Sequence, residues 1–236
     1  MSITLLQVII GGLLLGAVYA LLASGLTLIW GMMNVINFAH GDFVMVAMYT
    51  AFVVFKVMGL GPAASVPIAA LVLATLGVVV YFSLMRHIVE APIIAQILAT
   101  FGLALFLRYA TFWYFGANFL SLPGDLVGGT YDIGGIRLPA SRLLAGLVAL
   151  VLTAGLHLLL TRTSLGSKML AVAEDETAAQ LMGIQPAHMQ AVAWGLAAGA
   201  AGVAGALIAT FFYISPTVGE TLVIVAFVTV TLGGFG

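Results

Sequence analysis

The chain of 236 residues contains no cysteine and very little charge. Without cysteine it can form no disulfide, no thiolate zinc site and no cysteine-ligated iron–sulfur cluster. Charged residues make up 6% of the sequence, whereas about 25% is usual in a soluble domain. The formal net charge is −1 and no run of basic residues is present, which argues against a nucleic-acid-binding protein.

The sequence also lacks the short motifs that mark common catalytic centres. It contains no Gly-x-x-x-x-Gly-Lys-Ser/Thr phosphate loop, no His-Glu-x-x-His zinc motif and no Gly-x-Ser-x-Gly nucleophile elbow. We therefore expect no catalytic residues and no cofactor in the chain itself. A metal site is not expected either, because no second histidine cluster accompanies the neighbouring His40 and Asp42.

Apolar residues dominate what is present, at 63% of the sequence. A soluble fold of this length could not bury so much apolar surface, so we expect lipid to solvate the chain. The first charged residue is Asp42, and the uncharged stretch before it exceeds the roughly 20 residues that a spanning helix needs. This stretch has no basic start, and its apolar run over residues 3–30 is too long for a cleavable signal peptide.

Long continuous apolar runs favour helices over the short alternating strands of a membrane barrel. We therefore predict an all-α fold, a polytopic transmembrane helical bundle that forms one domain over residues 1–236. The six complete spans are predicted at residues 3–30, 43–58, 64–85, 93–115, 142–160 and 189–214. A seventh begins near Thr221 and covers only about 24 Å of a roughly 30 Å hydrocarbon core, so we expect the chain to be truncated there.

Two of these spans carry small residues at every fourth position. One stripe consists of Gly12, Gly16, Ala20 and Ser24, and the other of Ala198, Gly202 and Ala206, flanked by Gly195 and Gly199. In a membrane such stripes let helix backbones approach closely, and packing rather than the hydrophobic effect holds the helices together. We expect helix packing at both stripes and a central position for both spans.

Charge is concentrated in residues 161–189, between the fifth and sixth predicted spans. Three neighbouring acids stand at residues 174–176, out of eight acids in the chain. We predict two short helices here, the first capped by Ser164 and the second by Asp175, with Gly183 as the C-terminal cap. A solvated connecting loop would also explain the acids. The caps and an exposed apolar face instead favour a segment that docks into a groove of a partner protein.

Three runs of sequence together resemble a known family. The run E-T-A-A-Q-L-M-G at residues 176–183 resembles the E-x-A-A-x-x-x-G cytoplasmic loop of ATP-binding cassette (ABC) importer permeases, and residues 163–175 resemble its longer form in one branch of them. With residues 25–42 and 232–236, in this order and spacing, the whole chain resembles the membrane subunit of branched-chain amino-acid ABC importers. Members of that family continue beyond the point where this sequence stops.

The resemblance implies that residues 161–189 form a cytoplasmic coupling loop, which docks into a cleft on a separate ATPase subunit. The residues implied in this coupling are Glu176, Ala178, Ala179, Leu181, Met182 and Gly183. It further implies a second related permease subunit, a periplasmic substrate-binding protein, and import of leucine, isoleucine or valine across the bacterial inner membrane. A cytoplasmic coupling loop would place the N-terminus in the periplasm, whereas the numbers of basic residues in the loops do not decide the orientation.

A second group of polar residues stands just before the second predicted span. It consists of Asn34, Asn37, His40 and Asp42 and lies among glycines. Polar groups at membrane depth are costly and tend to face a cavity or a pore. The group could be an interfacial turn whose side chains satisfy freed backbone groups. We favour a discontinuous element that lines the translocation pathway or acts as a hinge.

Residues 116–141 are rich in glycine and predict a structured loop outside the membrane. By resemblance this loop is periplasmic. It either contacts the ligand-loaded binding protein, with Asp125, Asp132 and Arg137 at the rim of the contact, or only connects two spans.

Other function classes remain open at this point. An ATP-independent secondary transporter would need buried charged side chains as ion-coupling sites. Arg108, inside the fourth span, is the one candidate; we expect it to extend to the membrane surface rather than to contact a substrate, and Glu220 to lie at the interface. The lack of other charges within the spans counts against that class. A purely structural membrane subunit, or the same machinery carrying a sugar or another amide substrate, are the remaining alternatives.

Overall fold

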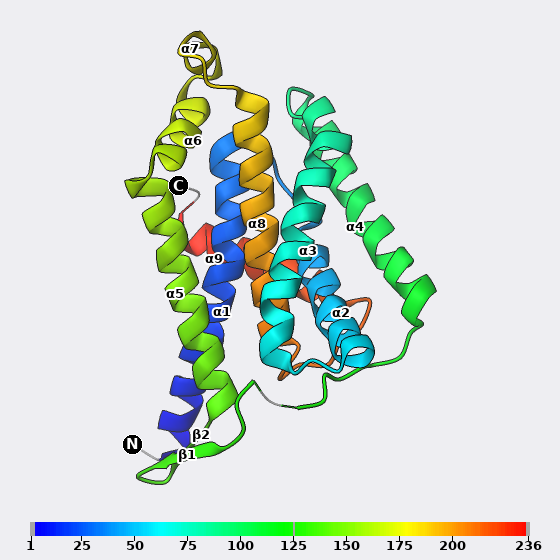
Figure 1. Cartoon of the computed structure of the whole chain (residues 1–236), viewed down its shortest axis with the longest axis vertical. Helices are drawn as coiled ribbons and strands as arrows, with labels where there is room; N and C mark the ends of the chain where they lie inside the picture. The colour runs from blue at the N-terminus through cyan, green and yellow to red at the C-terminus, as the bar shows by residue number, and fades with distance from the viewer. Residues whose placement is uncertain (1–2, 125, 235–236) are drawn as a thin grey trace.

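The computed structural model describes residues 3–124 and 126–234, which form a bundle of long helices with one small β-hairpin (Figure 1). The α-helices are α1 (Ile3–Met33), α2 (His40–Met58), α3 (Pro62–Ser83), α4 (Ile93–Phe115), α5 (Ala140–Arg162), α6 (Ser164–Glu174), α7 (Glu176–Leu181), α8 (Pro186–Ile208) and α9 (Val218–Gly233). A 3-10 helix, η1 (Met85–His87), follows α3, and the antiparallel strands β1 (Thr130–Ile133) and β2 (Ile136–Pro139) lie between α4 and α5.

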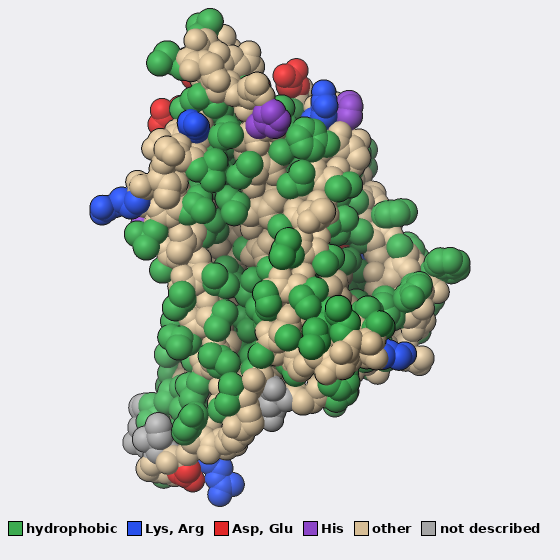
Figure 2. Space-filling model, viewed as in Figure 1, with side chains coloured by type: hydrophobic (Ala, Val, Ile, Leu, Met, Phe, Trp, Pro, Cys, Tyr) green, Lys and Arg blue, Asp and Glu red, His purple; other side chains and the backbone are tan. Residues whose placement is uncertain are grey.

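Six helical segments in the described part of the chain are long and apolar enough to cross a membrane. They are α1, α2, α3 with η1, α4, α5 and α8, whereas α9 has only 16 residues. Hydrophobic side chains cover the middle of the face shown in Figure 2, and charged side chains gather mostly toward its two ends. The predicted all-α, polytopic transmembrane bundle is therefore confirmed.

The two ends of the bundle carry different elements. Helices α6 and α7 project at one end, here called the α7 end, and the N-terminus and the hairpin lie at the other, the hairpin end (Figure 1). The hairpin turns at Gly134 and Gly135, whose φ angles are +62° and +86°. Two successive positive φ angles suit a two-residue hairpin turn, and glycine adopts them without a steric penalty. Asp125 lies outside the described residues, so its predicted place at a rim stays a prediction.

Helix α8 is the central element of the bundle. It packs against α1, α2 and α3, and most of its length is buried. A Cβ atom at Gly202 would lie only 2.7 Å from the backbone oxygen of Ala69 in α3, so no larger residue fits there without a backbone shift. Gly195 and Gly199 also face α3, where added Cβ atoms would lie 3.0 Å and 3.4 Å from side-chain carbons. This is the close approach that small residues permit in a membrane.

The small-residue stripe of α1 behaves differently. Added Cβ atoms at Gly12 and Gly16 would meet no atom within 4 Å in the described part of the chain. Both glycines are exposed, and the buried residues of α1 begin only at Ala17. The central position predicted for this span therefore holds for its second half alone. Packing at Gly12 and Gly16 would need a partner outside the described residues.

Two predicted boundaries need correction. The span predicted to reach residue 214 ends at Ile208, because Ile214 leaves the helix and exchanges two backbone hydrogen bonds with Leu120, at 2.8 and 2.9 Å. The cap predicted at Ser164 belongs to Thr163, whose Oγ1 accepts a hydrogen bond from the Gly166 N–H. Either hydroxyl could fill this role, and the sequence alone does not distinguish neighbouring Thr and Ser.

The chain is interrupted between α1 and α2. Residues 34–37 have no regular structure, and Asn34 has a φ of +53°. The His40 Nε2 atom lies 3.0 Å from the carbonyl oxygen of Leu22. Leu22 precedes the end of α1 by eleven residues, or about 16 Å along the helix axis. The linker therefore runs back along α1, and α2 begins beside Leu22 rather than at the end of α1.

Candidate functional site

Polar side chains gather at the start of α2, as the sequence predicts. Asn37 and His40 are fully buried. The Asn37 Oδ1 atom accepts a hydrogen bond from the Ala39 N–H at 3.0 Å and so closes the turn before α2. Asn37 Nδ2 and His40 Nδ1 have no hydrogen-bond partner in the described part of the chain. Asn34, by contrast, is exposed.

A cluster of three charged side chains lies beside this turn. Arg108 in α4 directs its Nε and Nη2 atoms to the Asp42 carboxylate in α2, at 3.3 Å, and its Nη1 atom contacts Glu220 in α9. The side chain of Asp42 has no exposed surface, Arg108 is 15% exposed and Glu220 is 56% exposed. We call Asp42, Arg108 and Glu220 the charged triad.

The charged triad corrects the expectation for Arg108. The side chain does not serve only to extend to the membrane surface, because the buried Asp42 on α2 and the partly exposed Glu220 on α9 both pair with it. The signal was present in the sequence: Arg108 is the one basic residue well inside an apolar span, and charged groups in a membrane usually pair. The identity of the partners depends on how α2, α4 and α9 pack, which spacing along the chain does not reveal.

Two glycines make this arrangement possible. A Cβ atom at Gly41 would lie 2.2 Å from the backbone oxygen of Gly219, and one at Gly219 would lie 2.7 Å from Asp42 Oδ1. Any side chain at either position would push α9 away from α2. The glycines therefore bring the first turns of the two helices into contact, and Asp42 and Glu220 both come within reach of Arg108.

The segment between α5 and α8 forms the two short helices that were predicted. The Asp175 Oδ1 atom accepts a hydrogen bond from the Ala178 N–H at 2.9 Å and caps α7 as expected. Gly183 follows α7 with a φ of +79°, and the Ile184 N–H then bonds to the Ala179 oxygen at 3.0 Å. This combination is the usual glycine end of a helix.

The tip of this segment is apolar and exposed. Leu181 is 85% exposed and Met182 is 82% exposed, and α7 stands clear of the other helices in Figure 1. Glu176 and Ala178 are also exposed, whereas Ala179 is buried. Large apolar side chains exposed together at the tip of a protein are typical of an interaction site.

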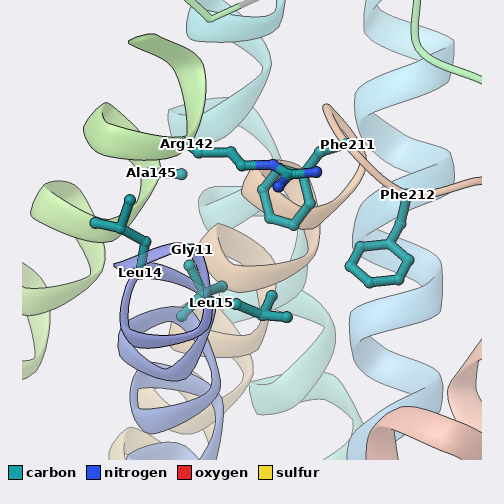
Figure 3. A pocket seen from close by; sticks show the side chains of 8 residues that line it. Gly11, Leu14, Leu15, Arg142, Ala145, Phe211 and Phe212 are labelled. Atoms are coloured by element: carbon teal, nitrogen blue, oxygen red, sulfur yellow. The ribbon is translucent and has the colours of Figure 1, made fainter. Parts of the chain in front are cut away.

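Two hollows adjoin α1. A small pocket of about 50 Å³ lies toward the hairpin end between α1, α5 and the turn after α8, where the Arg142 guanidinium lies 5.9 Å from the centre of the Phe211 ring (Figure 3). A larger, open groove of about 890 Å³ lies between α1, α5, α6 and the end of α9. Its walls are mainly apolar and include the Thr153 hydroxyl, which is buried without a hydrogen-bond partner in the described residues.

Comparison with known proteins identifies the family of this spanning bundle. Residues 8–236 match the family model described as branched-chain amino acid transport system / permease component. The chain belongs to this family. The recognition made from the three sequence runs is thereby confirmed, and the chain is a multi-pass membrane permease component of a transport system.

Individual relatives cover nearly the whole permease. It is 28% identical to the high-affinity branched-chain amino acid transport system permease protein BraD of Pseudomonas aeruginosa, over 98% of the permease and 80% of that relative. The permease is 30% identical to the probable branched-chain amino acid transport permease protein LivH of Methanocaldococcus jannaschii, over 95% of the permease and 72% of that relative. It is 26% identical to the high-affinity branched-chain amino acid transport system permease protein LivH of Escherichia coli K12, over 98% of the permease and 79% of that relative. No solved structure matches the permease.

Proposed function

We propose that the permease is the membrane-spanning subunit of an ATP-driven importer of the branched-chain amino acids leucine, isoleucine and valine. The observation that carries this proposal is the family match over residues 8–236. The relatives' names state the same substrate class. The permease has no phosphate-binding loop in its sequence, so ATP is hydrolysed on separate ATPase subunits.

Helix α7 is the element that couples the permease to an ATPase subunit. Leu181 and Met182 fill an apolar cleft on the ATPase, and Ala178 allows close approach beside them. Glu176, in the first turn of α7, either pairs with a basic group there or stabilises the helix start. Gly183 ends α7 with its positive φ, so the tip turns back directly into α8. The exposure of Leu181 and Met182 supports this role, because exposed apolar side chains at a helix tip favour a groove on a partner.

Coupling at α7 fixes the orientation of the bundle. The α7 end then faces the cytoplasm, and the hairpin end, with the N-terminus, faces the periplasm of a bacterial inner membrane. The hairpin contacts a substrate-binding protein there, and a second related permease completes the pathway. Solute passes by alternating access, with residues 34–42 in the pathway wall or at a hinge, as the buried and partly unpaired Asn37 and His40 suggest.

The charged triad gives one specific reason to keep a second candidate function. A secondary transporter driven by an ion gradient needs buried charges in its spans, and Asp42 and Arg108 provide a buried pair. The two candidates differ in their energy source. A further alternative, the same machinery with a sugar or amide substrate, differs from the proposed function only in the substrate.

The decisive experiment is uptake of labelled leucine by vesicles that contain the permease with its partner subunits. We expect uptake with ATP and loaded binding protein, and none with an ion gradient alone.

The double variant Leu181→Asp/Met182→Asp tests helix α7. It should no longer co-purify with the ATPase, and its uptake should be at least tenfold slower. Its matched control is His188→Asp, which places the same acid on an exposed position at the same end. Gradient-driven uptake without ATP would refute the proposal in favour of the secondary transporter.

A further inference from the structure

The two acids that hold Arg108 differ sharply in exposure. Asp42 is completely buried and accepts hydrogen bonds from one edge of the guanidinium, Nε and Nη2, at 3.3 Å. Glu220 is 56% exposed and contacts the remaining nitrogen, Nη1. Arg108 is thus anchored by a buried anion on one edge, and its other edge is covered by a carboxylate that reaches the surface.

These two contacts differ in how easily they can be exchanged. Removing one partner of a buried ion pair leaves an uncompensated charge and is strongly unfavourable. An ion pair with an exposed partner contributes little, because water and ions compete for the same groups. Glu220 can therefore leave Arg108 at small cost, provided that another anion takes its place, whereas Asp42 cannot.

We propose that Arg108 recognises the α-carboxylate of the transported amino acid, and that Glu220 occupies this position until the substrate displaces it. This inference rests on the proposed function. A guanidinium offers donors spaced to match a carboxylate. The Glu220 carboxylate has the same shape and charge as the substrate carboxylate that displaces it. Once displaced, Glu220 can pair with the α-ammonium group of the same molecule.

Recognition of this kind involves only the α-carboxylate and the α-ammonium group, which all α-amino acids share. The triad, with one cation and two anions, complements a zwitterion after Glu220 moves: the cation takes the carboxylate and the freed anion takes the ammonium. Its three members come from α2, α4 and α9, so binding there depends on how these helices are arranged. Charged side chains within membrane spans commonly mark substrate or ion pathways.

A purely structural triad would only hold the three helices together, and the double variant Asp42→Asn/Arg108→Gln separates the two roles. It replaces the buried ion pair with a neutral pair of similar shape that can still hydrogen-bond. The single variant Arg108→Gln leaves Asp42 as an unpaired buried charge and should lower the unfolding temperature of the complex. We expect the double variant to recover that temperature.

Leucine uptake is the second readout. If the triad were only structural, uptake would follow stability, so slow uptake by a stable variant indicates a role in substrate recognition. In the complete transporter with saturating loaded binding protein, the double variant should transport at least about tenfold more slowly than the unmodified permease, the loss expected for one charge-assisted hydrogen bond. ATP hydrolysis stimulated by the binding protein should persist. Arg142→Gln, which removes an exposed arginine outside the triad, is the control and should stay within about threefold of the unmodified permease.

Three outcomes would overturn the inference. Wild-type uptake by a stable double variant would make the triad structural only. Wild-type uptake by Arg108→Lys, which keeps the charge and loses the fork of donors, would give the same answer if the double variant is unstable. Disappearance of the defect in vesicles of phosphatidylcholine alone, which contain no anionic lipid, would assign Arg108 to the headgroup of an anionic lipid. An unmodified transporter without ATP-driven uptake would instead refute the proposed function.

Discussion

At the scale of single residues, glycine has two different meanings in this permease. Gly202 stands where α8 touches the backbone of α3, and its missing side chain is what allows the contact. Gly12 belongs to a stripe with the same spacing but faces open space in the described part of the chain. Spacing predicts which side of a helix can be approached closely, but it does not show which neighbour takes that position.

This difference gives a matched pair of substitutions. Gly202→Val should destabilise the permease by about 1–3 kcal/mol, because the new side chain forces a backbone shift in a packed interface. Gly12→Val makes the same chemical change in a helix and should cost less than about 0.5 kcal/mol. Thermal unfolding of both variants in detergent measures the difference. Equal losses would show that the space at Gly12 is occupied by something outside the described residues.

Caps and charges show how far single residues could be predicted. Asp175 caps α7 as expected, because its role depends only on residues three positions away. The partners of Arg108 lie 66 and 112 positions away. The sequence therefore identified a cationic residue within a span but not the carboxylates that neutralise it.

The cap at Asp175 is open to a direct test. Asp175→Ala removes the acceptor for the Ala178 N–H and should destabilise α7 by about 1 kcal/mol. Hydrogen exchange at the amides of α7 should then be about fivefold faster. Asp175→Ser retains a capping oxygen and should exchange close to the rate of the unmodified chain. Unchanged exchange in Asp175→Ala would show that contacts with α8 and α6, rather than the cap, hold α7.

At the scale of elements, apolar runs located all six complete spans, and their boundaries moved by a few residues. Two features escaped prediction. The hairpin β1–β2 was expected only as a structured loop, since its strands are four residues each and too short to give a pattern. The start of α2 beside Leu22, eleven residues before the end of α1, is fixed by the contact of His40 with Leu22, which depends on tertiary packing.

At the scale of the whole molecule, the absence of cysteine makes the proposed orientation measurable. Leu181→Cys and Tyr131→Cys each introduce one thiol at a position that is 85% and 58% exposed, at opposite ends of the bundle. A membrane-impermeant maleimide should label Tyr131→Cys in intact cells from outside and Leu181→Cys only after the cytoplasmic face is opened. The unmodified chain should stay unlabelled. Labelling of Leu181→Cys from outside would reverse the orientation and remove α7 from the ATPase.

The position of α8 in the chain has a mechanical consequence. Its 23 residues form a rod about 34 Å long, joined to α7 by four residues at one end and to α9 by nine residues at the other. With the proposed docking of α7, we expect a displacement of α7 to pass along α8 toward α9, the helix that bears Glu220. We then expect nucleotide-driven motion at α7 to weaken the contact of Glu220 with Arg108, without any separate sensor for the cargo.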